Sequence, residues 1–169
     1  MKDRRIVVGV DGTPGCEDAL LWAAGEAERA GARLVVAHAW DAGERHAPYA
    51  PHAWPDDLRY RRSRATAVLD RAVALAREAR PGLGVERRLV AGRAEAALTR
   101  VARGAALLVL GSAAHHAGDG RLGVVVLSCL RWPPCPVTVV PCRSVPAAHG
   151  GAPSGRLLEY AGAGDPETP

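Results

Sequence analysis

Short runs of apolar residues, almost uninterrupted by polar ones, recur along the chain. They occupy residues 6–10, 34–39 and 105–110 and are rich in Val, Ile, Leu and Ala. A strand that is apolar on both faces must be covered on both faces, which is the situation of a parallel sheet between helices. This pattern predicts an α/β fold and argues against an antiparallel sheet with one face in water.

The first two runs belong to one strand–helix–strand unit. Residues 6–10 end in Asp11-Gly12-Thr13-Pro14, where Thr13 can cap a helix and Pro14 suits its first position. Apolar residues then recur at helical spacing until Gly31, and the second strand follows at 34–39. Such a unit makes a right-handed crossover between two parallel strands.

The rest of the chain repeats this alternation. The further elements we expect are a long loop at 41–55, a helix at 56–80, a half-exposed edge strand at 85–90, a helix at 94–102, a strand at 105–110, a glycine-containing loop, a helix ending near Trp132, and a fifth strand between Pro136 and Pro141. Five strands alternating with four helices predict a doubly wound, open parallel sheet.

Composition divides the chain into a folded part and a tail. Of the 169 residues 48% are hydrophobic, enough for one core, so we expect a single domain over residues 1–143. Residues 144–169 are rich in Ala, Gly, Pro and Ser and predict a disordered C-terminal tail. A short helix at 155–160 that docks on a partner is the alternative for this tail.

Charge and hydropathy exclude several classes of function. The net charge of +4 comes almost entirely from arginine in an Ala-rich chain, which we interpret as compositional bias, so no nucleic-acid partner is expected. No apolar run approaches the roughly twenty residues of a membrane span, and the N-terminus does not resemble a signal peptide. We therefore expect a cytoplasmic protein, away from membranes, with reduced cysteines.

Candidate binding residues follow from the fold class, because doubly wound sheets bind ligands beyond the carboxyl ends of their strands. The residues at those ends are Asp11, Gly12 and Thr13 after the first strand, His38, Ala39 and Trp40 after the second, and Gly111 and Ser112, with the glycine loop, after the fourth. Glycines beside a helix start can present backbone N–H groups to a phosphate.

Four segments together resemble the universal stress protein family. They are Val8-Gly9-Val10-Asp11-Gly12-Thr13-Pro14, Val36-Ala37-His38-Ala39-Trp40, Leu107-Leu108-Val109-Leu110-Gly111-Ser112 and Cys135-Pro136-Val137-Thr138-Val139-Val140. Each segment alone is a weak signal, but the four occur in the family's order and spacing. The resemblance covers about residues 4–142.

The resemblance implies a flavodoxin-like (adenine nucleotide alpha hydrolase-like) sheet of order 3-2-1-4-5, usually dimeric, in a family many of whose members bind ATP. It places Asp11 near the ribose and the backbone of Ala39 at the adenine. It assigns the phosphates to a stretch of Gly, two residues, Gly, nine residues, Gly and then Ser or Thr, of which Gly111 is the first Gly.

The phosphate stretch departs from this pattern. Ala114 replaces the second Gly, the loop to the final Gly123 is one residue short, and Val124 replaces the Ser or Thr. Valine lacks the hydroxyl that would donate to a phosphate oxygen. The same loop also contains the potential phosphate ligands Gly118, Gly120 and Arg121, and an arginine can supply a charge-assisted hydrogen bond instead.

Two function classes therefore remain open. One is a regulatory domain that binds ATP or another adenine nucleotide without turnover in stress adaptation. The other is a dimeric interaction module that has lost the phosphate site. No acid, base and nucleophile converge in the sequence, so an enzyme is not expected, and slow ATP hydrolysis ranks last. His38 reads as a structural histidine rather than a general base.

Metal and redox sites have little support. His115, His116 and Asp119 are close in sequence, but adjacent side chains point apart, so no metal site is expected. Cys16 could be a redox residue only if a helix N-terminus lowered its pKa, and a buried structural thiol is the simpler interpretation.

The fifth strand predicts self-association. In the order 3-2-1-4-5 it lies at an edge, and Val137, Val139 and Val140 are apolar with no lysine to block pairing. We expect a homodimer in which two copies of residues 136–141 pair antiparallel. The alternative is a monomer in which Pro136, Pro141 or the tail covers this edge.

Overall fold

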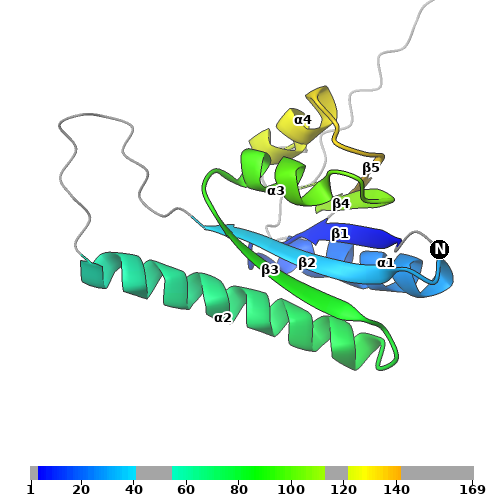
Figure 1. Cartoon of the computed structure of the whole chain (residues 1–169), viewed down its shortest axis with the longest axis horizontal. Coiled ribbons are helices and arrows are strands. Elements are labelled where there is room, and N and C mark those ends of the chain that lie inside the picture. The colour runs from blue at the N-terminus through cyan, green and yellow to red at the C-terminus, as the bar shows by residue number, and fades with distance from the viewer. Residues whose placement is uncertain (1–3, 41–54, 113–121, 142–169) are drawn as a thin grey trace, which may run out of the picture.

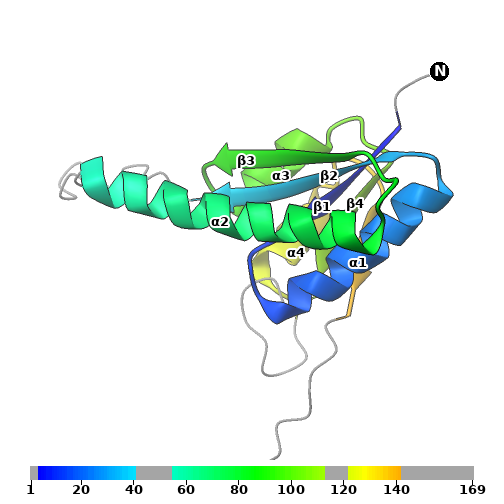
Figure 2. The ribbon, with the colours of Figure 1, turned by 90° about the horizontal axis from the view of Figure 1, so that it is seen from below.

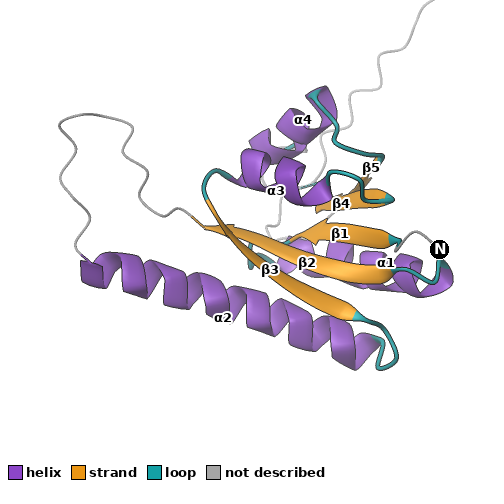
Figure 3. Cartoon of the chain, in the orientation of Figure 1, coloured by secondary structure: helices purple, strands orange, loops and turns teal. Residues whose placement is uncertain are grey.

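Five parallel strands form the centre of the molecule and four helices flank them in the computed structural model (Figure 1), which describes residues 4–40, 55–112 and 122–141. In chain order the elements are β1 (Arg5–Gly9), α1 (Pro14–Arg29), β2 (Arg33–Trp40), α2 (Pro55–Ala79), β3 (Val85–Ala91), α3 (Ala94–Ala102), β4 (Leu107–Gly111), α4 (Val124–Arg131) and β5 (Val137–Val140). Strands and helices alternate throughout these residues, as Figure 3 shows.

The sheet has the order β3-β2-β1-β4-β5, and every strand pair is parallel. In its register Val7 of β1 lies opposite Val35 of β2 on one side and Leu108 of β4 on the other. The predicted fold class and strand order are confirmed. Element bounds agree to within one or two residues; α2, for example, begins at Pro55, which the prediction had placed in the preceding loop.

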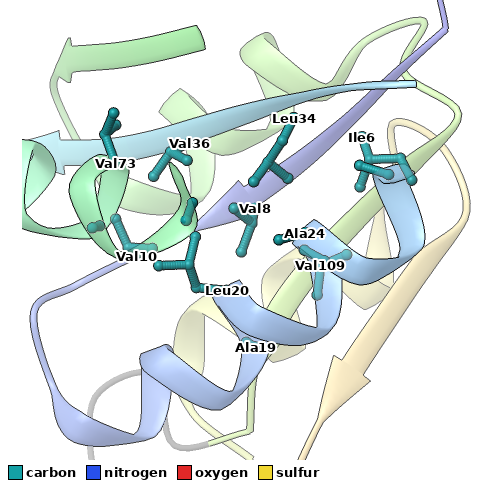
Figure 4. Packing of buried hydrophobic residues seen from close by; sticks show 14 of the residues in the cluster. Ile6, Val8, Val10, Ala19, Leu20, Ala24, Leu34, Val36, Val73 and Val109 are labelled. Carbon is teal, nitrogen blue, oxygen red and sulfur yellow. The ribbon is translucent and has the colours of Figure 1, made fainter. Parts of the chain in front are cut away.

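Side chains of each central strand alternate between two layers of helices. Ile6 and Val8 of β1 pack with α1 and α2 on one face, whereas Val7 packs with α3 and α4 on the other. Figures 2 and 4 show the first of these layers, with α1 lying directly beneath β1. This alternation explains why the strands are apolar on both faces.

An alanine-rich face lets α1 lie close to the sheet. Ala19, Ala23, Ala24 and Ala27 are fully buried, and Leu20 lies in the same core cluster as Leu69 and Val73 of α2. Because alanine loses no side-chain entropy on folding, this face is packed at low entropic cost.

Three predicted segments fall outside the described residues: most of the loop at 41–55, most of the glycine-containing loop before α4, and the tail at 144–169. Among the helices that the structure describes, none has both the length and the apolar character needed to cross a bilayer.

Close packing at Gly111 generates a stability prediction. A Cβ added at Gly111 would lie 3.0 Å from the backbone oxygen of Gly15 in α1, and backbone on both sides resists movement. We expect Gly111→Ala to lower the free energy of unfolding by about 1–3 kcal/mol, measured by urea denaturation. Gly82→Ala is the matched control, because nothing lies within 4 Å of its added Cβ. Equal unfolding midpoints for the two variants would contradict the packing argument.

Candidate functional site

A crevice opens at the carboxyl ends of β1 and β4. These strands are neighbours, but α1, which follows β1, covers one face of the sheet and α4, which follows β4, covers the other. This is the switch point at which doubly wound sheets bind ligands. A cavity occupies it, lined by Gly9, Val10, Asp11, Thr13, Gly15, Cys16, Ala37, His38, Ala39, Ala94, Leu98, Leu110, Gly111 and Val125.

Asp11 is held in place by the residue two positions further on. Both the backbone N–H and the hydroxyl of Thr13 donate to Oδ1 of Asp11, at 2.9 and 2.6 Å. This local turn corrects one prediction: Thr13 occupies the N-cap position of α1, but its side chain makes no capping hydrogen bond. The hydroxyl donates to Asp11 instead, because a local turn and a helix cap compete for the same side chain.

Gly12 makes the turn between β1 and α1 possible. Its φ of +81° lies in the left-handed region that favours glycine, and an added Cβ would be 3.1 Å from the side chain of Val68 in α2. The tight turn keeps Asp11 at the mouth of the crevice.

His38 ties the end of β2 to the end of β1. Its Nδ1 lies 2.7 Å from the carbonyl oxygen of Val10, and the N–H of Val10 donates to the carbonyl oxygen of Ala37 at 2.9 Å. Because a carbonyl can only accept, Nδ1 carries the proton. His38 is therefore hydrogen-bonded within the fold, as predicted.

Small residues at the end of β2 form one wall of the cavity. Ala37 packs in the layer of α3 and α4, and Ala39, two residues on, shares that face of the strand. Leu98 of α3 and Val125 of α4 add further apolar surface to the lining.

Backbone hydrogen bonds join the end of β4 to the start of α4. The N–H of Ser112 donates to Val140 of β5 at 2.8 Å, and the N–H of Gly123 donates to Ser112 at 3.2 Å. Gly123 is the N-cap of α4 without a side-chain cap, and Val124 follows as its first residue with 62% of its surface exposed. An exposed valine thus stands at the position where the family pattern has a hydroxyl.

The structure brings five of the predicted strand-end residues together around the cavity: Asp11, Thr13, His38, Ala39 and Gly111. Gly12, Ser112, Gly123 and Val124 lie beside it but do not line it. Gly118, Gly120 and Arg121 fall outside the described residues, as do Ala114, His115, His116 and Asp119.

Sequence reasoning missed the helical part of the lining. Cys16, Leu98 and Val125 come from three different helices, and their spacing in the sequence says only that they are buried. One hint of this lining was present in the sequence: Val125 directly follows Val124, which the family pattern had placed at the phosphates.

Asp11 is the only carboxylate or cationic side chain that lines the cavity within the described residues. An anionic group bound there would therefore contact backbone N–H groups rather than side-chain cations of those residues. The described part of the chain also contains no group of three or more His, Cys, Asp or Glu residues arranged to hold a metal ion.

Comparison with known proteins gives one consistent family. The sequence model of the universal stress protein family matches residues 3–141. No curated protein matches the chain.

Solved structures of this family are similar over most of their length. A universal stress protein family member from Burkholderia pseudomallei is 31% identical, with a TM-score of 0.62 over 82% of this chain and 96% of its own. A universal stress protein in complex with cAMP is 27% identical, with a TM-score of 0.63 over 82% and 97%. The universal stress protein from Archaeoglobus fulgidus in complex with dAMP is 23% identical, with a TM-score of 0.60 over 82% and 98%.

Cys16 lies in the first turn of α1 but has the properties of a buried thiol. Burial raises its pKa above the ordinary value of 9.0, and backbone hydrogen bonds with Asp11 and Gly12 only partly oppose this. The nearby Asp11 carboxylate also disfavours a thiolate. The raised pKa argues against the redox interpretation of Cys16.

The raised pKa predicts slow alkylation of Cys16. With iodoacetamide at neutral pH, we expect Cys16 in the folded chain to react at least about tenfold more slowly than in the urea-unfolded chain, because thiolate and access are both reduced. Mass spectrometry of the digested protein measures each site. Half-buried Cys135 is the internal control, and faster alkylation of Cys16 than of Cys135 in the folded chain would contradict the prediction.

Proposed function

The chain belongs to the universal stress protein family, and we propose that it is a regulatory domain that binds an adenine nucleotide without turnover in stress adaptation. The observation that carries this proposal is the cavity between β1 and β4, where Asp11, Ala39 and Gly111 meet from three strand ends. Relatives of similar fold have been crystallised with cAMP and with dAMP.

The nucleoside part of the ligand fits the described walls. The carboxylate of Asp11 accepts hydrogen bonds from the ribose hydroxyls, and its Oδ1 is already oriented by Thr13. Adenine lies against the backbone of Ala39 and the apolar side chains of Leu98 and Val125, a mixture typical of small-molecule sites.

The phosphate part of the site is the weaker one. Val124 offers no hydroxyl at the start of α4, and no described cation lines the cavity. The phosphates of ATP would be held by backbone N–H groups near Gly123 and the first turn of α4. We therefore propose that affinity comes mainly from adenosine, with ATP as one of several acceptable nucleotides.

The polar groups of the crevice are held by hydrogen bonds within the fold. His38 uses Nδ1 to hold Val10, and Oδ1 of Asp11 accepts two hydrogen bonds from Thr13. These hydrogen bonds fix the positions of both side chains, as a preformed binding site requires.

A dimeric interaction module remains the second candidate, and one observation favours it. β5 (Val137–Val140) is an edge strand with no charged side chain, and all four of its residues are only partly buried. Antiparallel pairing of two such edges would satisfy their backbone groups and cover the valines.

Nucleotide titration tests the proposed site. We expect Asp11→Ala to weaken binding of AMP and of ATP by about tenfold or more in calorimetry, because a ribose hydroxyl loses a charged acceptor worth about 1.5–3 kcal/mol. Asp70→Ala is the matched control: it removes an exposed carboxylate that pairs with Arg87 at 3.1 Å, away from the crevice. If the unaltered chain binds neither nucleotide, the proposal fails and the interaction module takes its place.

The start of α4 gives an independent prediction. Val124→Ser restores a hydroxyl donor and should raise the affinity for ATP by about tenfold, equivalent to about 1.4 kcal/mol. Leu127→Ser is the control, since Leu127 is similarly exposed (54%) on the same helix but one turn away. Equal affinities of both variants in the same titration would show that side chains at position 124 do not reach the phosphates.

A further inference from the structure

The edge of the sheet opposite β5 is charged. At the middle of β3, Arg87 and Arg88 are both exposed and point to opposite faces of the strand. Arg87 forms an ion pair with Asp70 of α2 at 3.1 Å, and Arg88 forms one with Glu86 at 2.5 Å. Each face of this edge therefore carries a guanidinium group.

A groove of about 360 Å³ adjoins this edge on the side of α3. It is lined by the charged residues Arg5, Arg33, Glu86, Arg88 and Arg100, and by the apolar Val35, Leu89, Val90 and Val101. Four arginines face one glutamate, so positive charge is in excess by three. The groove exists because α3 packs on β1 and β2 and leaves this face of β3 uncovered by any described helix.

Two arginines of the groove form ion pairs that carboxylates of a partner could replace. Glu86 bridges Arg33, at 3.1 Å, and Arg88, so one carboxylate already lies between two guanidinium groups. Arg100 is exposed in the last turn of α3. Both ion pairs are partly open to solvent, so carboxylates of a partner can compete with Glu86 for these guanidinium groups.

The free edge of β3 selects against a second copy of this chain. Among the described residues β3 (Val85–Ala91) pairs with β2 alone, and Arg88 is its central residue. Antiparallel pairing of two β3 strands about their centre would set Arg88 opposite Arg88, and like charges directly opposite are destabilising. Edge charges of this kind prevent self-pairing while remaining compatible with a strand of opposite charge.

We propose that the β3 edge and its groove form a docking site for an extended acidic segment of a partner protein. The segment adds to the sheet as a strand beside β3, so its backbone pairs with the free edge. Its carboxylates meet Arg88 on the groove side and Arg87 on the α2 side. Aliphatic side chains between them cover Val90 and Val101. Backbone pairing favours a peptide over a nucleic acid.

A dye-labelled synthetic peptide with the repeat Glu-Glu-Val-Glu, which as a strand carries carboxylates on both faces and valines on one, tests this site with the full chain. Fluorescence anisotropy should show saturable binding that weakens as salt rises from about 0.05 to about 0.5 M. Arg88→Glu should weaken it at least about tenfold. Arg100→Glu, on a different element, should also weaken it. Arg59→Glu on α2 is the control with the same charge change and should leave binding unchanged. No saturable binding, or equal loss in all three variants, would overturn the proposal.

Two further ligands separate strand addition from simple charge attraction. A Glu–Val peptide with proline in place of its central valine keeps every charge but loses a backbone donor, so it should bind at least about tenfold more weakly. Equal binding would overturn strand addition. A single-stranded oligonucleotide of matched charge should compete poorly, and stronger competition than that of the peptide would assign the groove to nucleic acid. These tests use no nucleotide ligand of the crevice and are independent of the function proposed above.

Discussion

Burial of the parallel sheet on both faces is the constraint on which the rest of the structure depends. Val7 and Val8 point into opposite helical layers, so neither face of β1 can carry a polar side chain. Polar side chains are therefore confined to the ends of the strands and to the outer edges of the sheet. The crevice with Asp11 lies at strand ends, and the groove with Arg88 lies at an edge of the sheet.

The sequence predicted the fold well because the periods of its apolar residues are unambiguous. Uninterrupted runs identified the buried strands, and the alternating pattern of 85–90 identified an edge strand, which the order β3-β2-β1-β4-β5 confirms. The strand ends then located Asp11 and Ala39. The remaining lining could not be predicted, because Leu98 and Val125 meet only after two helices pack. The role of Thr13 was not predicted either. A threonine hydroxyl can cap a helix or donate to a neighbouring carboxylate, and the sequence favours neither.

The two edges of the sheet differ in the kind of strand that could pair with them. β5 carries valines and a threonine, which suit an identical strand, whereas β3 carries adjacent arginines, which suit an unlike one. Backbone groups are the same on both edges, so the side chains alone set the choice of partner. The proposed self-association through β5 and the proposed docking at β3 would therefore use different edges of the sheet.

The hydrogen bond from His38 to Val10 has a consequence for acid conditions. Because Nδ1 is the donor, adding a proton to the other ring nitrogen leaves this bond intact. The hydrogen bond that fastens the end of β2 to the end of β1 is therefore the same for the neutral ring and for the doubly protonated ring. If Nδ1 accepted a hydrogen bond instead, protonation of the ring would break that bond, and this contact would act as a pH switch.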